Sequence, residues 1–218
     1  MFITFEGSEG GGKTTQAREL AATLREQGHD VLLTREPGGT VIGDEVRRLL
    51  MEKNDTTSHE DMRPNTELLL FCASRAQLVA EVIRPHLAKG GIVLCDRYID
   101  STYAYQGYGH ALDLDTLRTI VSFATGGLMP DLTVFFDITP EAGLKRRAAA
   151  SLFGEEFTRM DAMELAFHKR VYDGYQQLIA AEPDRWQRID AAQSIEAVQK
   201  DLRAIVAAHL KSGDPHEN

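Results

Sequence analysis

The decisive stretch of this sequence is Gly7-Ser8-Glu9-Gly10-Gly11-Gly12-Lys13-Thr14, followed by Thr15. It matches the pattern G-x-x-x-x-G-K-[ST] and lies between an apolar run, residues 1–5, and a helical pattern. Glycines let successive backbone N–H groups point inward at a phosphate, and the N-terminus of the following helix favours an anion. Lys13 can reach the outer phosphates, and Thr14 can offer its hydroxyl to Mg²⁺. A glycine-rich turn capping a helix is the simpler alternative, but the strand–loop–helix context favours a loop that binds a nucleoside triphosphate.

Short apolar runs alternate with longer helical patterns along the rest of the chain. The strand candidates are residues 2–6, 30–34, 91–95, 131–136 and 186–190, and the helix candidates are 12–27, 41–52, 65–88, 100–109, 113–125, 140–150, 161–181 and 194–211. The third and fourth runs are continuously apolar, as central parallel strands are. This alternation predicts an α/β fold, in which helices cover both faces of a five-stranded parallel sheet. Ligands of such sheets bind beyond the carboxyl ends of the strands.

The chain shows no internal repeat and no linker that would divide it. Residues 1–211 are therefore predicted to form a single domain. Within it, residues of about 148–160 mix small side chains with paired acids between two helical patterns, and they are predicted to form a lid. The polar residues 53–63 are predicted to be a loop, and residues 212–218 a flexible tail.

Composition excludes several classes of partner. The 218 residues carry a formal net charge of −9, which argues against binding a nucleic acid polymer, because such binding needs a basic surface. The sequence has no signal-peptide pattern and no apolar run long enough to span a bilayer, so no membrane partner is expected. Cys72 and Cys95 lie in apolar runs and are expected to be buried, reduced thiols. These features predict a cytoplasmic protein.

An acid and an arginine follow the third predicted strand, in Cys95-Asp96-Arg97-Tyr98. Next to a phosphate-binding loop, Asp96 is placed to hold Mg²⁺ together with Thr14, as phosphoryl-transfer sites require. The planar guanidinium of Arg97 is suited to a phosphate. A structural Asp–Arg pair at the strand end is the alternative, and the phosphate-binding loop favours the functional interpretation.

Two further groups of residues suggest a second ligand. Arg35 and Pro37 follow the second predicted strand, where Arg35 would meet an incoming anion, although a turn with a solvated arginine also fits. Phe71 and Arg75 are four apart on a predicted helix and share a face. A ring and a guanidinium on one face can stack on a base and bond its edge, but spacing alone favours a core role for the aromatic.

Taken together and in order, four motifs resemble the thymidylate kinases of bacteria. They are Phe-Glu-Gly-x-Glu-Gly-x-Gly-Lys-Thr-Thr (5–15), Arg-Glu-Pro-Gly-Gly-Thr (35–40), Phe-x-Ala-x-Arg-Ala-Gln (71–77) and Asp-Arg-Tyr-x-x-Ser-x-x-Ala-Tyr-Gln-Gly (96–107). Each motif is moderately specific at best, whereas the ordered set is highly specific and extends from residue 2 to about residue 190. The resemblance implies a P-loop kinase fold, and a homodimer that would form through the apolar faces of helices 65–88 and 100–125.

The resemblance also implies a reaction and a set of ligand contacts. The enzyme would move the γ-phosphoryl group of ATP to dTMP, with Mg²⁺ as cofactor, and residues 7–15 would bind ATP. In such kinases the residue at Phe71 stacks on thymine, that at Arg75 bonds the base edge, and that at Gln106 helps hold the nucleoside. The remaining positions that match dTMP contacts are Glu9 near the sugar 3′-hydroxyl, Arg35 and Arg97 near the acceptor phosphate, Ser101 and Tyr105 near the nucleoside, and Pro37.

The lid departs from the family pattern. Relatives without an arginine in the phosphate-binding loop usually carry lid arginines in a pattern such as Arg-x-Arg-Gly-x-x-Asp-Arg-x-Glu. Here only Thr158-Arg159-Met160-Asp161 matches its last part, and small and acidic residues replace the preceding arginines. The catalytic set expected from the resemblance is therefore Lys13 and Arg97 with Arg159 as the main lid arginine and Arg147 as a second candidate. Arg159 could instead merely anchor the lid helix.

Three other functions are alternatives to this reaction. A kinase acting on another monophosphate or on a nucleoside would share the scaffold and differ in the base pocket. A nucleotide-switched binding protein would need segments that order around the γ-phosphate and a residue that orients water, and the sequence shows no such arrangement. A weakly active, degenerate kinase is compatible with the altered lid.

Overall fold

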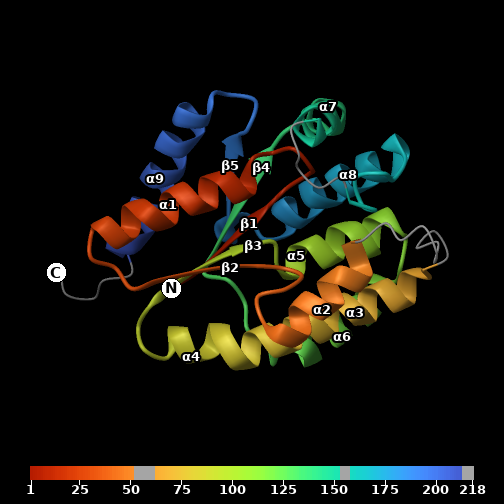
Figure 1. The fold of residues 1–218 in the computed structure, drawn as a ribbon, viewed down its shortest axis with the longest axis horizontal. Helices are drawn as coiled ribbons and strands as arrows, with labels where there is room; N and C mark the ends of the chain where they lie inside the picture. The colour runs from red at the N-terminus through yellow and green to blue at the C-terminus, as the bar shows by residue number, and fades with distance from the viewer. Residues whose placement is uncertain (52–61, 153–157, 213–218) are drawn as a thin grey trace.

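A five-stranded parallel sheet lies at the centre of the computed structural model, which describes residues 1–51, 62–152 and 158–212 (Figure 1). Its strands are β1 (Phe2–Glu6), β2 (Val31–Arg35), β3 (Ile92–Asp96), β4 (Leu132–Asp137) and β5 (Trp186–Asp190). They are arranged in the order β2-β3-β1-β4-β5. The predicted α/β fold with a five-stranded parallel sheet is confirmed, and each strand lies within one residue of its predicted position.

Strand burial follows position in the sheet. The three inner strands, β1, β3 and β4, are buried along nearly their whole length, while the edge strands β2 and β5 are partly exposed. Inner strands face helices on both sides and have no free edge, so a continuously apolar sequence is stable there. Successive side chains of a strand point to opposite faces of the sheet. Phe2 and Ile3 show this alternation, because they lie in different hydrophobic clusters on opposite faces.

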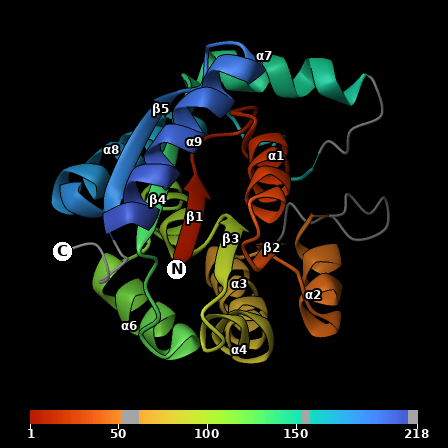
Figure 2. The ribbon, with the colours of Figure 1, turned by 90° about the vertical axis from the view of Figure 1, so that its left-hand side faces the viewer.

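One face of the sheet is covered by α1 (Lys13–Glu26) and α9 (Ile195–Ser212), which lie side by side in both ribbon views (Figures 1 and 2). Leu20 of α1 and Leu202 of α9 pack with Phe5 and Val134 in the cluster beneath them. Because α1 begins directly after the phosphate-binding loop, this packing fixes the direction in which its N-terminus points.

The opposite face carries two clusters. Beneath β3, α3 (Pro64–Leu78) packs with α6 (Leu114–Thr125) around Leu68, Val93 and Leu117. Beneath β4 and β5, α8 (Leu165–Ala181) contributes Phe167 and Tyr175 to a cluster rich in aromatic side chains, and residues at the end of α2 (Val41–Met51) belong to the same cluster. Cys72 and Cys95 are both buried and free, as predicted.

Three predicted helices differ from the observed ones. The pattern at 65–88 forms α3, a π-helical turn η2 (Val79–Ile83) and α4 (Arg84–Leu87). The pattern at 100–109 forms α5 (Ile99–Thr102) and the π-helix η3 (Tyr103–Gly109). The prediction 161–181 is wrong at its start: α8 begins at Leu165, because Asp161 accepts hydrogen bonds from the backbone and side chain of Thr158 in a preceding turn.

The lid prediction falls partly outside the described residues. Helix α7 (Pro140–Ser151) leads into it, and the Thr139 side chain caps this helix by accepting from the Ala142 amide. Residues 153–157 of the predicted lid, 53–61 of the predicted loop and 213–218 of the predicted tail lie outside the described part of the chain. Among the described helices, none is long and apolar enough to cross a membrane.

A buried ion pair joins α5 to the turn that precedes β5. Asp100 of α5 is fully buried and accepts hydrogen bonds of 2.7 and 2.9 Å from both terminal nitrogens of Arg185, in the turn η4 (Pro183–Arg185) before β5. Arg185 also donates to Thr133 of β4. Burial raises the pKa of Asp100 and the Arg185 contacts oppose this rise. Without Arg185, a buried carboxylate would remain without a compensating charge.

We expect Arg185→Met to lower the free energy of unfolding by about 3–5 kcal/mol, because breaking a buried pair leaves one charge uncompensated. The matched control is Arg118→Met, which removes an exposed i,i+3 pair with Asp115 and should cost less than about 1 kcal/mol. Urea unfolding of both variants measures the difference. Equal effects of the two substitutions would contradict a structural role for the Asp100–Arg185 pair.

Candidate active site

The phosphate-binding loop is positioned by close backbone contacts. It connects β1 to α1, and Gly7, Gly10 and Gly12 have φ angles of 137°, 71° and 81°, which favour glycine. A Cβ atom on Gly10 would lie 2.1 Å from the Gly143 carbonyl oxygen of α7. The loop therefore lies directly against α7, and the glycines predicted from the motif are required by this approach as well as by the turn.

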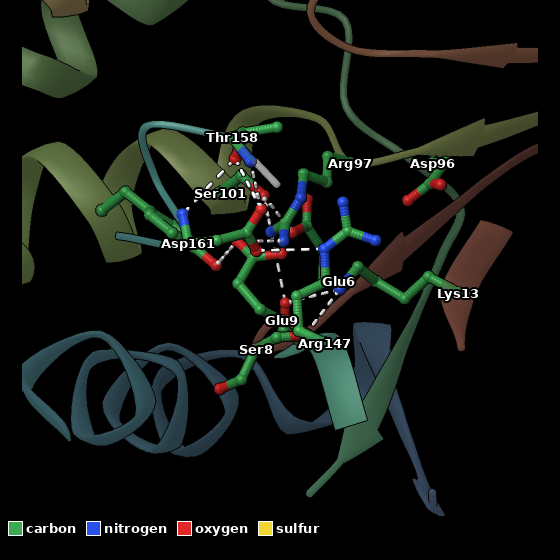
Figure 3. A network of polar contacts seen from close by, with 12 residues as sticks. Glu6, Ser8, Glu9, Lys13, Asp96, Arg97, Ser101, Arg147, Thr158 and Asp161 are labelled. Carbon is green, nitrogen blue, oxygen red and sulfur yellow. Dashed lines mark hydrogen bonds and ion pairs between the residues drawn. The ribbon is translucent and has the colours of Figure 1, made fainter. Parts of the chain in front are cut away.

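Lys13 lies folded across the loop. Its Nζ atom donates to the Gly7 and Ser8 carbonyl oxygens at 2.9 and 2.7 Å, and the side chain is buried (Figure 3). Burial and the nearby Arg97 lower the pKa of Lys13 to about 8, while Glu9 and Asp96 oppose this shift. A phosphate anion at the loop would raise this pKa again, because a nearby negative charge favours the charged form of lysine.

Thr14 and Asp96 meet at the ends of α1 and β3. The Thr14 hydroxyl donates to Asp96 Oδ2, and both residues line the cavity. Their oxygens are the ligand type that Mg²⁺ prefers. The two residues predicted to hold the metal are thus neighbours, brought together because β1 and β3 are adjacent strands.

Arg97 and Glu9 form an ion pair at the centre of the site (Figure 3). Arg97 Nη2 lies 2.8 Å from Glu9 Oε1, and the Tyr105 hydroxyl donates to the same oxygen at 2.8 Å. Burial alone would raise the pKa of Glu9, but Arg97, Lys13 and Tyr105 outweigh it and lower this pKa to about 2. Arg97 also donates to Ser101 Oγ, and its φ of 69° turns the chain sharply after β3.

The side chains predicted to hold a base lie on α3 and η3. Phe71 is half-buried, and Arg75 is 1% exposed and pairs with Glu36 at 2.7 Å. Burial would lower the pKa of Arg75, but Glu36 reverses the effect and raises it. Arg75 Nη1 is buried and has no hydrogen-bond partner within the described part of the chain. It is therefore a donor available to a ligand, and Arg75 lines the cavity together with Phe71 and Gln106.

The residues after β2 complete this side of the cavity. Arg35 is exposed, whereas Pro37 is buried and its carbonyl oxygen accepts from Arg47 at 3.1 Å. All three line the cavity. Arg35 remains at the sheet edge where a solvated arginine and a phosphate contact are both sterically possible, so its predicted role in binding a phosphate stays a prediction.

The two predicted lid arginines occupy different places. Arg147 of α7 lines the cavity, and its Nε atom lies 3.1 Å from Asp161 Oδ1. Arg159 points elsewhere: it donates to the Leu50 carbonyl oxygen and forms an ion pair with Glu67, and it is absent from the described cavity lining. The structure thus offers Arg147 rather than Arg159 to a ligand in this conformation.

These groups surround one cavity of about 580 Å³. Of the predicted site residues, only Gly7, Ser8 and Arg159 do not line it. Further lining residues that the sequence analysis did not identify are Arg18, Glu36, Arg47, Met51, Tyr98, Thr102, Arg146, Ala150, Thr158, Met160 and Asp161. Glu36 lies within a quoted motif and could have been found there, whereas Arg18 and Arg47 lie on ordinary helical patterns without a distinguishing signal.

A phosphate-binding loop at the carboxyl end of a parallel sheet, in one cavity with further arginines such as Arg75 and Arg97, is the arrangement of a nucleoside monophosphate kinase with a P-loop. Comparison with known proteins gives the family. The family model described as thymidylate kinase matches residues 5–202. The chain therefore belongs to the thymidylate kinase family, as the motifs suggested, and a nucleotide-switched binding protein is set aside.

Individual relatives agree with this assignment. The thymidylate kinase of Roseiflexus castenholzii is 54% identical over 221 aligned positions, which cover 97% of this chain and 95% of the relative. That of Exiguobacterium sp. is 46% identical over 214 positions, with 98% and 97% coverage. The crystal structure of thymidylate kinase from Ehrlichia chaffeensis superposes with a TM-score of 0.74 at 33% identity, covering 95% of this chain and 98% of that one.

The placement of the two lid arginines predicts a difference in catalysis. We expect Arg147→Ala to lower kcat by about 100-fold or more, as when a group that stabilises transition-state charge is removed. Arg159→Ala should lower kcat much less, because Arg159 faces Glu67. Steady-state kinetics at saturating nucleotides test both variants. A larger kcat loss in Arg159→Ala than in Arg147→Ala would instead support Arg159 as the main lid arginine.

Proposed function

We propose that this chain transfers the γ-phosphoryl group of ATP to dTMP, giving ADP and dTDP for dTTP synthesis. The observation that carries the proposal is that one cavity is lined both by the phosphate-binding loop and by a ring, an arginine and an amide suited to a pyrimidine. Membership of the thymidylate kinase family supports the choice of substrates. The described cavity lining holds groups suited to phosphates, to Mg²⁺ and to a pyrimidine.

The reaction needs position and charge neutralisation more than covalent chemistry. An oxygen of the dTMP phosphate attacks the γ-phosphorus, the bond from that phosphorus to the β,γ-bridging oxygen breaks, and ADP leaves with the bridging oxygen. The acceptor oxygen is already anionic, so no strong general base is required. Lys13, Arg97 and Arg147 are the cations that we assign to the transferred group, where pre-positioned charges stabilise the transition state.

Arg97 must exchange partners for this role. It is paired with Glu9, while Ser101 and the Gly7 carbonyl oxygen hold its other terminal nitrogen. A phosphate beside the loop would compete with Glu9 for Arg97, and Tyr105 would keep Glu9 hydrogen-bonded. Glu9 would then lie near the sugar of dTMP, with Arg35 and Pro37 on the phosphate side.

The oxygens of Thr14 and Asp96 fit Mg²⁺, and we assign the cofactor to them. Both residues lie beside the phosphate-binding loop, and because they are hydrogen-bonded to each other, their oxygens are close enough to bind one ion together. When bound, Mg²⁺ would neutralise charge on the β- and γ-phosphates. The protein's own contribution is to hold the hydroxyl and the carboxylate at the ends of two packed elements, α1 and β3.

The proposed reaction is tested by a coupled ADP-release assay. We expect strong turnover with Mg·ATP and dTMP, weaker turnover with dUMP, and little with dCMP, UMP, AMP, thymidine or no acceptor. Preference for another monophosphate or for thymidine would move the chain to a sibling kinase. ADP release that is independent of any acceptor would indicate a nucleoside triphosphatase, and inactivity with all acceptors would support a degenerate kinase.

We also propose a cytoplasmic homodimer formed through α3 and α6. These helices pack against each other and expose Leu69 and Phe123, which are 57% and 91% accessible. Such large exposed apolar side chains are suited to an interface.

Sedimentation equilibrium should therefore give a dimer for the unaltered chain and a monomer for Phe123→Asp, because the new carboxylate would be buried at the interface. The control is Met129→Asp, which alters an exposed apolar residue just beyond α6. A monomer without any substitution, or a dimer that Phe123→Asp leaves intact, would contradict this interface.

A further inference from the structure

A buried carboxylate lies behind the base side of the cavity. Glu67 of α3 is 1% exposed, and both of its oxygens have partners. Oε1 accepts from Gln106 Nε2 at 2.7 Å and lies 3.2 Å from His110 Nε2, while Oε2 accepts from Arg159. Glu67 itself does not line the cavity, whereas its partner Gln106 does.

The charge on Glu67 is held by these neighbours. Burial alone would raise its pKa, but the His110 ring nearby, the hydrogen bonds from Arg159 and Gln106 and the charge of Arg159 lower the pKa to about 2. Glu67 is therefore a carboxylate at any pH at which a kinase is assayed. An ionised carboxylate only accepts hydrogen bonds and donates none.

This restriction determines which way the Gln106 amide faces. A glutamine amide has a donating end and an accepting end of nearly the same shape, so shape alone does not select its orientation. With its NH₂ group bound to Glu67, Gln106 keeps its carbonyl oxygen for a ligand. Turning the amide over would place two oxygens against each other inside the protein and lose a hydrogen bond to a charged group.

The orientation of Gln106 has a direct consequence for base choice. Thymine presents an N3–H donor beside its C4 carbonyl acceptor, whereas cytosine presents an N3 acceptor beside a C4 amino donor. The Gln106 carbonyl oxygen matches the N3–H group, and the unpartnered Arg75 Nη1 matches the C4 carbonyl. The N3 acceptor of cytosine would face the Gln106 carbonyl oxygen, which is also an acceptor, and its C4 amino donor would face the Arg75 donor. Both arrangements leave buried polar groups unpaired.

We propose that Glu67 is a positioning residue that sets base specificity: it fixes the Gln106 amide so that the pocket accepts only a pyrimidine bearing an N3–H group. Arg159 and His110 keep Glu67 charged and in place, which gives Arg159 a function away from the phosphates. The inference rests on the proposed function, in that the site takes dTMP as acceptor.

The test compares dTMP with 5-methyl-dCMP in the Glu67→Gln variant. The two nucleotides share the 5-methyl group, the sugar and the phosphate, so their comparison isolates the hydrogen bonds at N3 and C4. The amide that this substitution introduces can donate as well as accept, which frees Gln106 to turn over. We expect the ratio of kcat/KM for dTMP to that for 5-methyl-dCMP to fall at least tenfold, mainly through KM for the acceptor.

Two further variants separate this role from a merely structural one. Arg159→Gln removes one of the groups that hold Glu67 but leaves the carboxylate beside Gln106, so it should change the substrate ratio less than Glu67→Gln does, even where turnover falls. The exchange Glu67→Gln/Gln106→Glu restores a carboxylate–amide pair and again presents an acceptor to N3–H. This double variant should return the ratio to within about threefold of the unaltered enzyme, and it carries the test if Glu67→Gln alone fails to fold.

The outcomes are distinct. Equal losses with both nucleotides in Glu67→Gln would overturn the inference, because a structural role alone does not change selectivity. Failure of the double variant to prefer dTMP would overturn it as well. Absence of dTMP turnover in the unaltered enzyme would instead refute the proposed function, and that result is visible before any variant is made.

Discussion

The active site is organised around one buried carboxyl group, that of Glu6 at the end of β1. It is fully buried and accepts three hydrogen bonds, from the Tyr98 amide at 2.8 Å, Ser101 Oγ at 2.6 Å and the Tyr175 hydroxyl at 2.8 Å. These donors come from the start of α5 and from α8. Because an unpaired carboxylate in this position would be costly, the donors must all be in place, and they hold α5 and α8 around the phosphate-binding loop. Burial, with Asp100 nearby, raises the pKa of Glu6 to about 7.

The sheet and the loop could be predicted well from the local sequence, because both depend on short-range rules. Strand positions follow from apolar runs, and residues 7–14 combine a glycine pattern with a strand before and a helix after. Such rules did not predict where the helical patterns are interrupted by other turns. Val79–Ile83 and Tyr103–Gly109 adopt π-helical turns inside continuous helical patterns, and no residue pattern there distinguishes them from α-helix. Tertiary packing selects these turns.

Site residues that belong to a motif could be predicted from the sequence. The orientation of a side chain that depends on a partner far away in the chain could not. Asp96 and Arg97 follow a strand, so their location beside the loop follows from the order of the sheet. Glu67 carries no motif signal of its own, and its three partners are 39, 43 and 92 residues away in the chain. The orientation of Arg159 toward Glu67 rather than toward the cavity depends on that buried partner. The family pattern predicted Arg159 as the main lid arginine without revealing which group it contacts.

A chain with a net charge of −9 that binds two anionic nucleotides must concentrate its positive charge locally. The described cavity lining does so, with eight basic side chains against four acidic ones. Three of those acids are held in ion pairs, since Glu9, Glu36 and Asp161 face Arg97, Arg75 and Arg147. The fourth, Asp96, faces Thr14 at the proposed metal site. The acids therefore do more than reduce the local charge: they hold the arginines in defined places before a ligand binds. In the proposed reaction, incoming phosphates would bind Arg97 and Arg147 without first ordering them, which would lower the entropic cost of assembling the site.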